Sequence, residues 1–405
     1  MGCRVNQSES SVIEGTLKEN GVTIVSLSEK PDFCVVNTCA VTAKGDYNSR
    51  QLIRRAARSG AKVIVTGCYS QLMADDVGRM AGVHKVVDNS GKFGIVKMIT
   101  DRNADIFLGC YSRSRPFLKI QDGCNLNCSY CIVPTVRGRS RSISEDEVIE
   151  NVSVIASRGY NEVVLTGIHL GAYGKDLAQK SNLKKVLIRI LRETRIKRVR
   201  LSSLEIMELD EELIEILAEE RVCRHLHLPL QSGSDAVLRS MKRGYSASYF
   251  SDKIRMIASR INNISVGSDI IVGFPGERDQ DFLATCDLID SLPISYLHIF
   301  PFSSRPGTEA SMMKARVDDA TTKSRAHILG EIGRLKKRAY LQGQLNTHLD
   351  IILEEPAGAD SYIGTSSNYV KVRASASGHA KGSLVRVRPV SMAEDLLDAV
   401  VVESS

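Results

Sequence analysis

Short β-branched runs alternate with helical patterns in the first hundred residues. FCVVNTC, which begins at Phe33, and KVIVTGC, which begins at Lys62, each predict a strand that closes on a cysteine. QLIRRAARSG between them predicts a helix with a basic outer face that stops at Gly60. This βαβ rhythm predicts parallel strands whose C-terminal ends lie together. Cys39 and Cys68 should therefore share one edge of a sheet.

The alternation becomes longer and more regular between Pro116 and Phe302. Six strands are predicted, with helical patterns between them: PFLKIQ, EVVLTG, RVRLSS, HLHLPL, SVGSDIIVG and SYLHIFPF. Ser144 and Glu147 form a capping box at the start of the first helix, which Gly159 ends. The pattern predicts a partial (β/α)6 barrel, in which chemistry belongs at the C-terminal ends of the strands.

Alternating strands return after a basic helix that is predicted around GRLKKRAY. DIILEE, YVKVRA and SLVRVRPV are separated by Gly, Ser and Asn turns, which predicts a small antiparallel β-barrel. The fold class is therefore α/β. We expect an N-terminal α/β domain over residues 1–100, the partial barrel over 110–335 and the small β-barrel over 340–405, with the candidate linker at 101–115.

Composition limits the classes of protein to which the chain can belong. A chain of 405 residues, 43% of them apolar, can fill about three cores. The polar start MGCRVNQSES and the lack of any apolar run near roughly 18 residues predict a cytoplasmic protein. Ten cysteines then indicate metal or redox chemistry, because the cytosol keeps thiols reduced. With 54 basic and 47 acidic residues, any nucleic-acid surface should be local.

The segment GCNLNCSYC places Cys124, Cys128 and Cys131 in a C-x3-C-x2-C array after the first barrel strand. A structural zinc site needs a fourth ligand, and the nearest following candidates, His169 and Cys223, are distant in sequence. Three thiolates suit an iron–sulfur cluster that leaves one iron open to a small molecule. Zinc remains the alternative at this point.

Three further cysteines lie in polar loops beside Gly, Asn or Thr: Cys3, Cys39 and Cys68. A second cluster with its own open iron would explain them. Cysteines within apolar patterns are typical of buried small hydrophobes, and this interpretation suits the others: Cys34, Cys110, Cys223 and Cys286.

The array, with Tyr130 just before its last cysteine, resembles the motif of the radical S-adenosylmethionine (SAM) superfamily. That resemblance implies that SAM occupies the open iron and that one electron from the cluster yields a 5′-deoxyadenosyl radical. With the second triad and the order of domains, the whole chain resembles the radical SAM methylthiotransferases, which end in a TRAM domain. Seven segments are similar to the branch that acts on N6-threonylcarbamoyladenosine in tRNA: GCRVNQSES, NTCAVT, CIVPTVRG, LTGIHLGAYG, SSLE, HLHLPLQSGS and FSSRPGT.

The resemblance implies insertion of sulfur and then methyl at C2 of adenine 37, beside the anticodon. It implies SAM and two [4Fe-4S] clusters as cofactors. It implies that Cys124, Cys128 and Cys131 bind the catalytic cluster that holds SAM, and that Cys3, Cys39 and Cys68 bind the second cluster. The residues expected beside SAM are Tyr130, Thr166, Gly167, Glu205 and Gln231. The implied partners are tRNA, a reductant such as flavodoxin or ferredoxin, and a sulfur donor, with no membrane.

Basic residues predict where RNA phosphates bind. The expected contacts are Arg137, Arg139 and Arg141 after the first array, and Lys371, Arg373, Arg386 and Arg388 on two strands of the tail. Ile143 stands where the family has a further Arg. The family also has a strand ahead of the GCR motif, so we expect Cys3 to lie on a frayed terminus.

Other residues and functions stay open. We assign no role to His225 and His227, whereas Asp269 and Glu277 are candidates to support the cofactor through hydrogen bonds. The alternatives are a methylthiotransferase for isopentenyladenosine or for a ribosomal protein, and a zinc-stabilised RNA-binding protein. IHLGAYG argues against the isopentenyl substrate, and the basic tail argues against the protein substrate.

Overall fold

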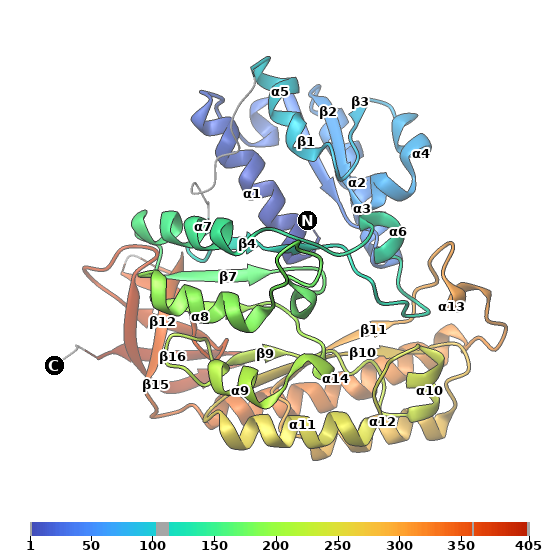
Figure 1. Ribbon diagram of the computed structural model, residues 1–405, viewed down its shortest axis with the longest axis vertical. Coiled ribbons are helices and arrows are strands. Elements are labelled where there is room, and N and C mark those ends of the chain that lie inside the picture. Colours follow the sequence, from blue (N-terminus) through green and yellow to red (C-terminus); the bar gives the residue numbers. More distant parts are fainter. Residues whose placement is uncertain (1, 103–112, 359, 403–405) are drawn as a thin grey trace.

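Three domains follow one another along the chain in this computed structural model (Figure 1). The structure describes residues 2–102, 113–358 and 360–402. Cys110 and most of the expected linker therefore lie outside the described residues.

The N-terminal domain is a parallel three-stranded sheet of order β1-β2-β3, packed against helices. Thr38 at the end of β1 pairs with Gly67 at the end of β2, which confirms the predicted βαβ unit and places Cys39 and Cys68 at one edge. A first helix that the hydrophobic pattern did not predict precedes the sheet. The elements are α1 (Arg4–Glu19), β1 (Phe33–Thr38), α2 (Ala43–Arg58), β2 (Lys62–Gly67), α3 (Cys68–Leu72), α4 (Ala74–Gly78), β3 (Val83–Val86) and α5 (Ile95–Thr100).

The middle domain contains the six predicted parallel strands in two groups of three, β4-β7-β8 and β9-β10-β11. A bridge between Val199 and Val222 joins the groups into one open, curved sheet. The strands are β4 (Phe117–Lys119), β7 (Glu162–Thr166), β8 (Arg198–Leu201), β9 (His225–His227), β10 (Ser265–Val272) and β11 (Tyr296–Pro301), and a short antiparallel pair, β5 (Gln121–Asp122) and β6 (Arg141–Ser142), lies beside the cysteine loop.

Helices cover the outer face of this partial barrel (Figure 1). Their apolar sides meet the sheet in one large core that includes Val152, Leu187, Phe250 and Ile289. Ser144 accepts a bond from the Glu147 amide at 3.2 Å, which is one half of the predicted capping box. The helices are α6 (Val133–Arg137), α7 (Glu145–Ser157), α8 (Leu183–Glu193), α9 (Glu211–Leu217), α10 (Asp235–Ser240), α11 (Ala247–Arg260), α12 (Asp279–Ser291), α13 (Glu309–Met312) and α14 (Asp319–Gln342).

The C-terminal domain is a closed five-stranded barrel of order β12-β13-β14-β16-β15. All neighbouring strands are antiparallel except β14 and β16, which are parallel. The strands are β12 (Leu349–Pro356), β13 (Ser361–Ser366), β14 (Lys371–Ser375), β15 (Leu384–Ala393) and β16 (Leu396–Val401).

Two arginines of β8 fasten this small barrel to the middle domain. Arg198 donates to the carbonyl groups of Asp350 and Thr365, and Arg200 donates to those of Ser366 and Ser367, over 2.6–3.2 Å. The carboxylate of Glu162, fully buried on β7, pairs with both guanidinium groups. In the described part of the chain, no helix is long and apolar enough to cross a membrane.

Candidate active site

The Cys124–Cys131 loop lies at the C-terminal end of the first barrel strand, between β5 and α6. Gly123, at φ +71°, lets the loop approach the chain at Arg139 so closely that a Cβ would lie 2.1 Å from that carbonyl oxygen. Within the loop, the Leu126 amide donates to Cys124 Sγ at 3.4 Å. Burial and the neighbouring Cys128 and Cys124 thiols raise the pKa of Cys131 to about 12.

Two further side chains contact these cysteines: Arg243, which sequence reasoning missed, and His169, which it considered only as a distant zinc ligand. Arg243, buried after α10, donates to Cys128 Sγ at 3.4 Å and also pairs with Glu205. His169 Nδ1 lies 3.8 Å from Cys124 Sγ, and its Nε2 lies 2.6 Å from a carboxylate oxygen of Glu208. Arg243 belongs to none of the segments that carry the resemblance, so only the folded chain reveals its contact with the array.

The residues expected beside SAM all lie on the same rim as this loop. Gln121 connects two of these segments, because its amide donates to the Gly123 carbonyl and accepts from the His169 amide. Gly167 packs against Gln121, where a Cβ would lie 2.8 Å from its Oε1. The buried Thr166 hydroxyl has no hydrogen-bond partner among the described residues, as a group that awaits a ligand would.

The other expected SAM contacts lie at the ends of β8 and β9 and in the cysteine loop. Glu205 pairs with the Arg243 guanidinium. Gln231 adopts φ +70°, an uncommon conformation for a residue with a side chain, and its backbone pairs with β10. Tyr130 packs against Val237 and Phe274 in a small apolar cluster, which orients the loop.

Cys3, Cys39 and Cys68 form a second triad at the edge of the N-terminal sheet. Burial raises the pKa of the Cys39 thiol, and the nearby thiols of Cys3 and Cys68 raise it further. Cys3 is exposed and is the N-cap residue of α1, where its carbonyl accepts from the Gln7 amide at 3.0 Å, so it is not frayed as expected. Arg305 of the FSSRPGT segment donates to the Ala40 carbonyl at 3.1 Å and so holds the Cys39 loop against the middle domain.

Arg137 lies inside the protein and not on the RNA-facing surface where the sequence placed it. It is 3% exposed. Its guanidinium pairs with Glu9 at 2.9 Å and Asp122 at 3.0 Å, and Nε donates to Cys68 Sγ at 3.3 Å. The prediction of a phosphate contact at Arg137 is therefore wrong, because this charge is already neutralised by buried carboxylates.

Both triads have the donor chemistry that iron–sulfur clusters need. All six cysteines are free thiols, and each triad receives one guanidinium hydrogen bond, from Arg243 or from Arg137. Cationic donors stabilise thiolate ligands and compensate the negative charge of a thiolate-bound cluster. Helix α6 follows Cys131 directly, packs through Val136 beside Cys68 and carries Arg137, so one short helix adjoins both triads.

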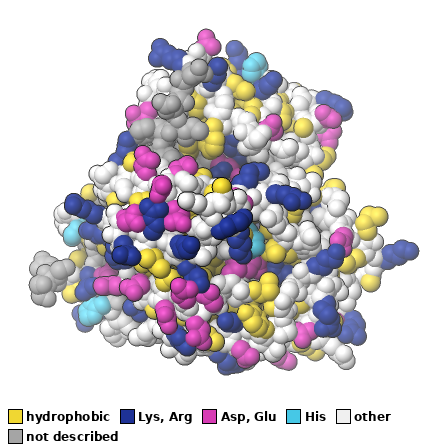
Figure 2. Space-filling model, viewed as in Figure 1, with side chains coloured by type: hydrophobic (Ala, Val, Ile, Leu, Met, Phe, Trp, Pro, Cys, Tyr) yellow, Lys and Arg dark blue, Asp and Glu magenta, His cyan; other side chains and the backbone are white. Residues whose placement is uncertain are grey.

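The remaining residues expected to bind RNA are exposed or partly exposed. Arg139 and Arg141 flank the cysteine loop on its outer side. On the C-terminal barrel, three of the four basic residues pair with acids on other strands of the barrel: Lys371 with Glu354, Arg373 with Asp398 and Arg386 with Asp350. Figure 2 likewise shows Lys and Arg interspersed with Asp and Glu over this face of the molecule.

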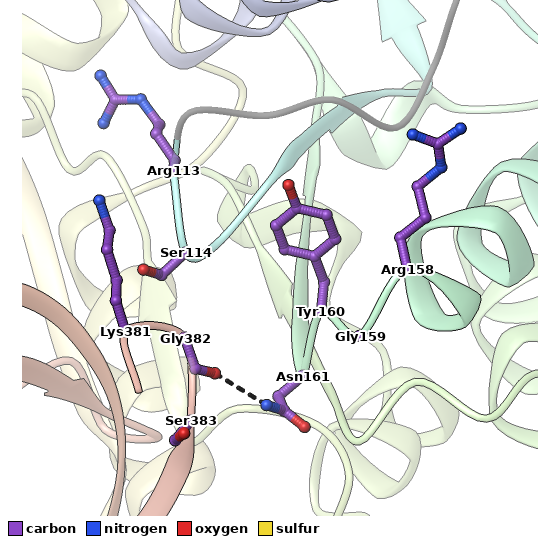
Figure 3. Close-up of a pocket in the computed structure, with 9 residues that line it drawn as sticks. All are labelled: Arg113, Ser114, Arg158, Gly159, Tyr160, Asn161, Lys381, Gly382 and Ser383. Carbon is purple, nitrogen blue, oxygen red and sulfur yellow. Dashed lines mark hydrogen bonds between the residues drawn. The ribbon is translucent and has the colours of Figure 1, made fainter. Parts of the chain in front are cut away.

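A solvent-accessible pocket of about 470 Å³ lies away from both triads. Figure 3 shows it between the loops that precede β4, β7 and β15, where Asn161 donates to the Gly382 carbonyl at 2.8 Å. It lies at the N-terminal ends of the barrel strands, opposite the cysteines, and we assign it no part in the chemistry.

The residues proposed to support the cofactor from GFPGE and its flanks divide into two groups. Glu277 accepts from the Gly273 amide at 2.7 Å and pairs with Arg325, so it stabilises the turn. Asp269 lies within 3.2 Å of both His227 and His298. Burial opposes ionisation of Asp269, but hydrogen bonds from these histidines lower its pKa to about 2. Asp269 therefore forms a polar group with His227, to which the sequence assigned no role, and with His298.

Comparisons with known proteins agree with this geometry. Residues 118–289 match the radical SAM superfamily, and residues 1–88 match a family described as Uncharacterized protein family UPF0004. The chain is 36% identical over 379 residues to the threonylcarbamoyladenosine tRNA methylthiotransferase MtaB of Aquifex aeolicus, covering 88% of this chain and 92% of that protein. The protein of the same name from Bacillus subtilis is 35% identical over 416 residues, covering 96% and 92%.

Two further comparisons are more distant. The tRNA-2-methylthio-N(6)-dimethylallyladenosine synthase of Desulforamulus reducens is 29% identical over 437 residues, covering 99% of this chain and 94% of that protein. Among solved structures, the radical S-adenosylmethionine methyltransferase TsrM of Kitasatospora setae matches with a TM-score of 0.54 and 17% identity, over 73% of this chain and 67% of that one. This last likeness concerns the fold alone.

Proposed function

This chain belongs to the radical SAM methylthiotransferases, and from this membership we propose that it transfers a methylthio group to C2 of N6-threonylcarbamoyladenosine at position 37 of tRNA. The observation that carries the proposal is the pair of cysteine triads, each with its own guanidinium donor, on the two sides of α6. The cluster of the first triad would cleave SAM, and the cluster of the second triad would carry the sulfur that is transferred.

The reaction explains why the chain needs both triads. The C2–H bond of adenine is not acidic, so a general base is a poor means of replacing it and one-electron chemistry is required. When bound, the two clusters and SAM supply the electron, the radical, the sulfur and the methyl group. Cys124, Cys128 and Cys131 would hold the SAM-binding cluster, and Cys3, Cys39 and Cys68 the second cluster. The polar rim from Thr166 to Gln231 would orient SAM.

The substrate assignment follows the more similar relatives. Relatives named for threonylcarbamoyladenosine are 31–36% identical to this chain, whereas the relative named for dimethylallyladenosine is 29% identical. Zinc is set aside because members of this family hold iron–sulfur clusters in both places.

Partners and location complete the proposal. Arg139, Arg141, Lys371, Arg373, Arg386 and Arg388 would contact tRNA phosphates. A reductant such as flavodoxin or ferredoxin would supply electrons, a sulfur donor would replenish the second triad, and the protein would act in the cytoplasm.

The decisive experiment is mass spectrometry of tRNA nucleosides from cells with and without this protein. We expect the methylthio form of threonylcarbamoyladenosine to vanish in its absence, while the unmethylthiolated nucleoside accumulates. Persistence of that nucleoside together with loss of another methylthio nucleoside would show that the substrate is wrong.

Cysteine variants separate the roles of the two triads. Cys128→Ala should abolish SAM cleavage and product together, whereas Cys39→Ala should still form 5′-deoxyadenosine but no methylthio product. Both are assayed on reconstituted protein, with Cys34→Ala of the N-terminal domain as the matched control that keeps both activities. Product formation by Cys39→Ala would contradict the assignment of the second triad.

A further inference from the structure

Tyr369 of the C-terminal barrel is a junction of all three domains. Its hydroxyl accepts from Arg4 Nη2 of the N-terminal domain at 3.2 Å. Its ring stacks on His225 of the middle domain, with centroids 4.2 Å apart. Tyr369 holds this position at φ +67°, a conformation that a bulky side chain rarely adopts.

Positive charge is in excess at this junction. The guanidinium groups of Arg4 and Arg200 lie 5.6 and 5.3 Å from the centre of the Tyr369 ring. Glu162 neutralises Arg200, but no carboxylate among the described residues pairs with Arg4. Although burial raises the pKa of Tyr369, Arg4, Arg115 and Arg200 together hold it below the ordinary value. An anion would therefore be stabilised beside the Tyr369 hydroxyl.

A wall of flat side chains leads from this junction along the inner face of the barrel. His225 Nε2 lies 2.8 Å from the Tyr296 hydroxyl, and the rings of Tyr296 and His298 are 5.3 Å apart. The His298 side chain is 53% exposed and His225 is 1% exposed, so the wall opens to solvent at its His298 end. Flat aromatic faces of this kind can stack a nucleobase.

Arg4 is the first residue of α1 and directly follows Cys3 of the second triad. In threonylcarbamoyladenosine, C2 and the carbon that bears the N6 substituent belong to the same six-membered ring, one nitrogen apart. A side chain that binds the N6 substituent therefore also sets the position of C2 relative to the second triad.

We infer that Arg4 and the Tyr369 hydroxyl bind the carboxylate of the threonyl group and so select threonylcarbamoyladenosine over adenosines with a neutral N6 substituent. This inference rests on the proposed function. A guanidinium makes strong charge-assisted hydrogen bonds with a carboxylate. An isopentenyl group offers no such acceptor, and its binding would leave the junction's positive charge unsatisfied.

The test measures the dissociation constant of reconstituted full-length protein for one tRNA in two forms, with and without the threonylcarbamoyl group on adenine 37. The variants are Arg4→Gln, Arg4→Lys and Tyr369→Phe, and exposed Arg79→Gln of the N-terminal domain is the control. Iron and sulfide content is determined for each, because Arg4 adjoins a cluster ligand.

We expect Arg4→Gln to weaken binding of the threonylcarbamoyl form by roughly tenfold to hundredfold and to leave binding of the bare form unchanged. Arg4→Lys should recover part of this lost affinity, and Tyr369→Phe should weaken binding less than Arg4→Gln does. The iron and sulfide content should be the same in all variants. Equal weakening of both forms would show that Arg4 contacts a tRNA phosphate instead, and would overturn the inference.

Two other results would overturn it as well. One is an Arg4→Gln variant that still discriminates between the two tRNAs, and the other is a wild-type protein that binds both equally. Conversion of threonylcarbamoyladenosine by the wild-type protein tests the proposed function separately, so the two failures are distinguishable.

Discussion

At the scale of single residues, charges buried between domains define the second triad. Glu9 of α1 accepts from Arg137 and Lys119 at 2.9 Å and also pairs with Lys92. Burial raises the pKa of Glu9, but these cations hold it well below the ordinary value, so the carboxylate is ionised in the folded protein. Arg137 then presents its remaining N–H to Cys68. The network therefore fixes the positions of the Cys68 thiol and of the Arg137 guanidinium beside it.

Replacing Arg137 tests this buried role against the RNA contact that the sequence predicted. Arg137→Met should lower the free energy of unfolding of the cluster-free protein by about 3–5 kcal/mol, because it leaves Glu9 and Asp122 short of a partner. Exposed Arg139→Met should cost less than about 0.5 kcal/mol. Urea denaturation measures both.

The salt dependence of tRNA binding gives the opposite pattern. Arg139→Met should reduce the slope of log K against log salt by about 1, and Arg137→Met should leave it unchanged. A lower slope for Arg137→Met at unchanged stability would restore Arg137 as a phosphate contact.

At the scale of elements, the edge formed by β1 and β2 positions two of the second triad's cysteines. Gly67 adopts φ +101° and packs so tightly that a Cβ would lie 2.4 Å from the Thr38 carbonyl oxygen. Only glycine permits this close approach of the strand ends that precede Cys39 and Cys68. The spacing of the thiols thus depends on the backbone.

Gly67→Ala should therefore separate Cys68 from Cys39 and lower the iron content of the second triad after reconstitution. The matched control is Gly60→Ala in the same domain, which has φ +86° but nothing within 4 Å of its Cβ position. Iron and sulfide analysis measures the outcome. Equal iron content in both variants would show that the close approach is not required.

Periodic elements were predictable from the sequence because their signals are local. All six barrel strands, the parallel β1–β2 pair and the cysteine loop follow from runs of a few residues. Helix α1 was missed because its inward side carries polar residues, Asn6, Ser8 and Glu9, which are all buried. Arg137 was misplaced because its partner Glu9 is 128 residues away, and nothing nearby distinguishes it from exposed Arg139.

At the scale of the whole molecule, Glu162 helps to hold the C-terminal domain on the middle domain, because it pairs with Arg198 and Arg200. Burial raises the pKa of this carboxyl, but Arg200, Arg198 and Arg115 hold it well below its ordinary value of 4.5. A carboxyl whose folded pKa is lowered contributes stability above its unfolded pKa and loses it as pH falls. The attachment of the small barrel should therefore weaken in acid.

Glu162→Gln should lower the free energy of unfolding at pH 7 by about 3–5 kcal/mol, because two buried guanidinium groups lose their counter-charge. The stability of the variant should also fall less than that of the wild type between roughly pH 5 and pH 3. Urea midpoints at several pH values measure this. Glu193→Gln, at an exposed ion pair with Arg189, is the control and should change little. Parallel pH curves for Glu162→Gln and wild type would contradict the prediction.

The hydrogen bonds from Arg198 and Arg200 to four carbonyl groups also bear on whether the protein or the tRNA changes shape when the two bind. Reorienting the small barrel would break these buried bonds together, so we expect the C-terminal domain to stay fixed on the middle domain when tRNA binds. We then expect the tRNA to supply most of the change in shape, by unstacking its base as the substrates of other enzymes that act on extruded nucleotides do. The fraction of anticodon loops that are already open would then limit the rate of binding.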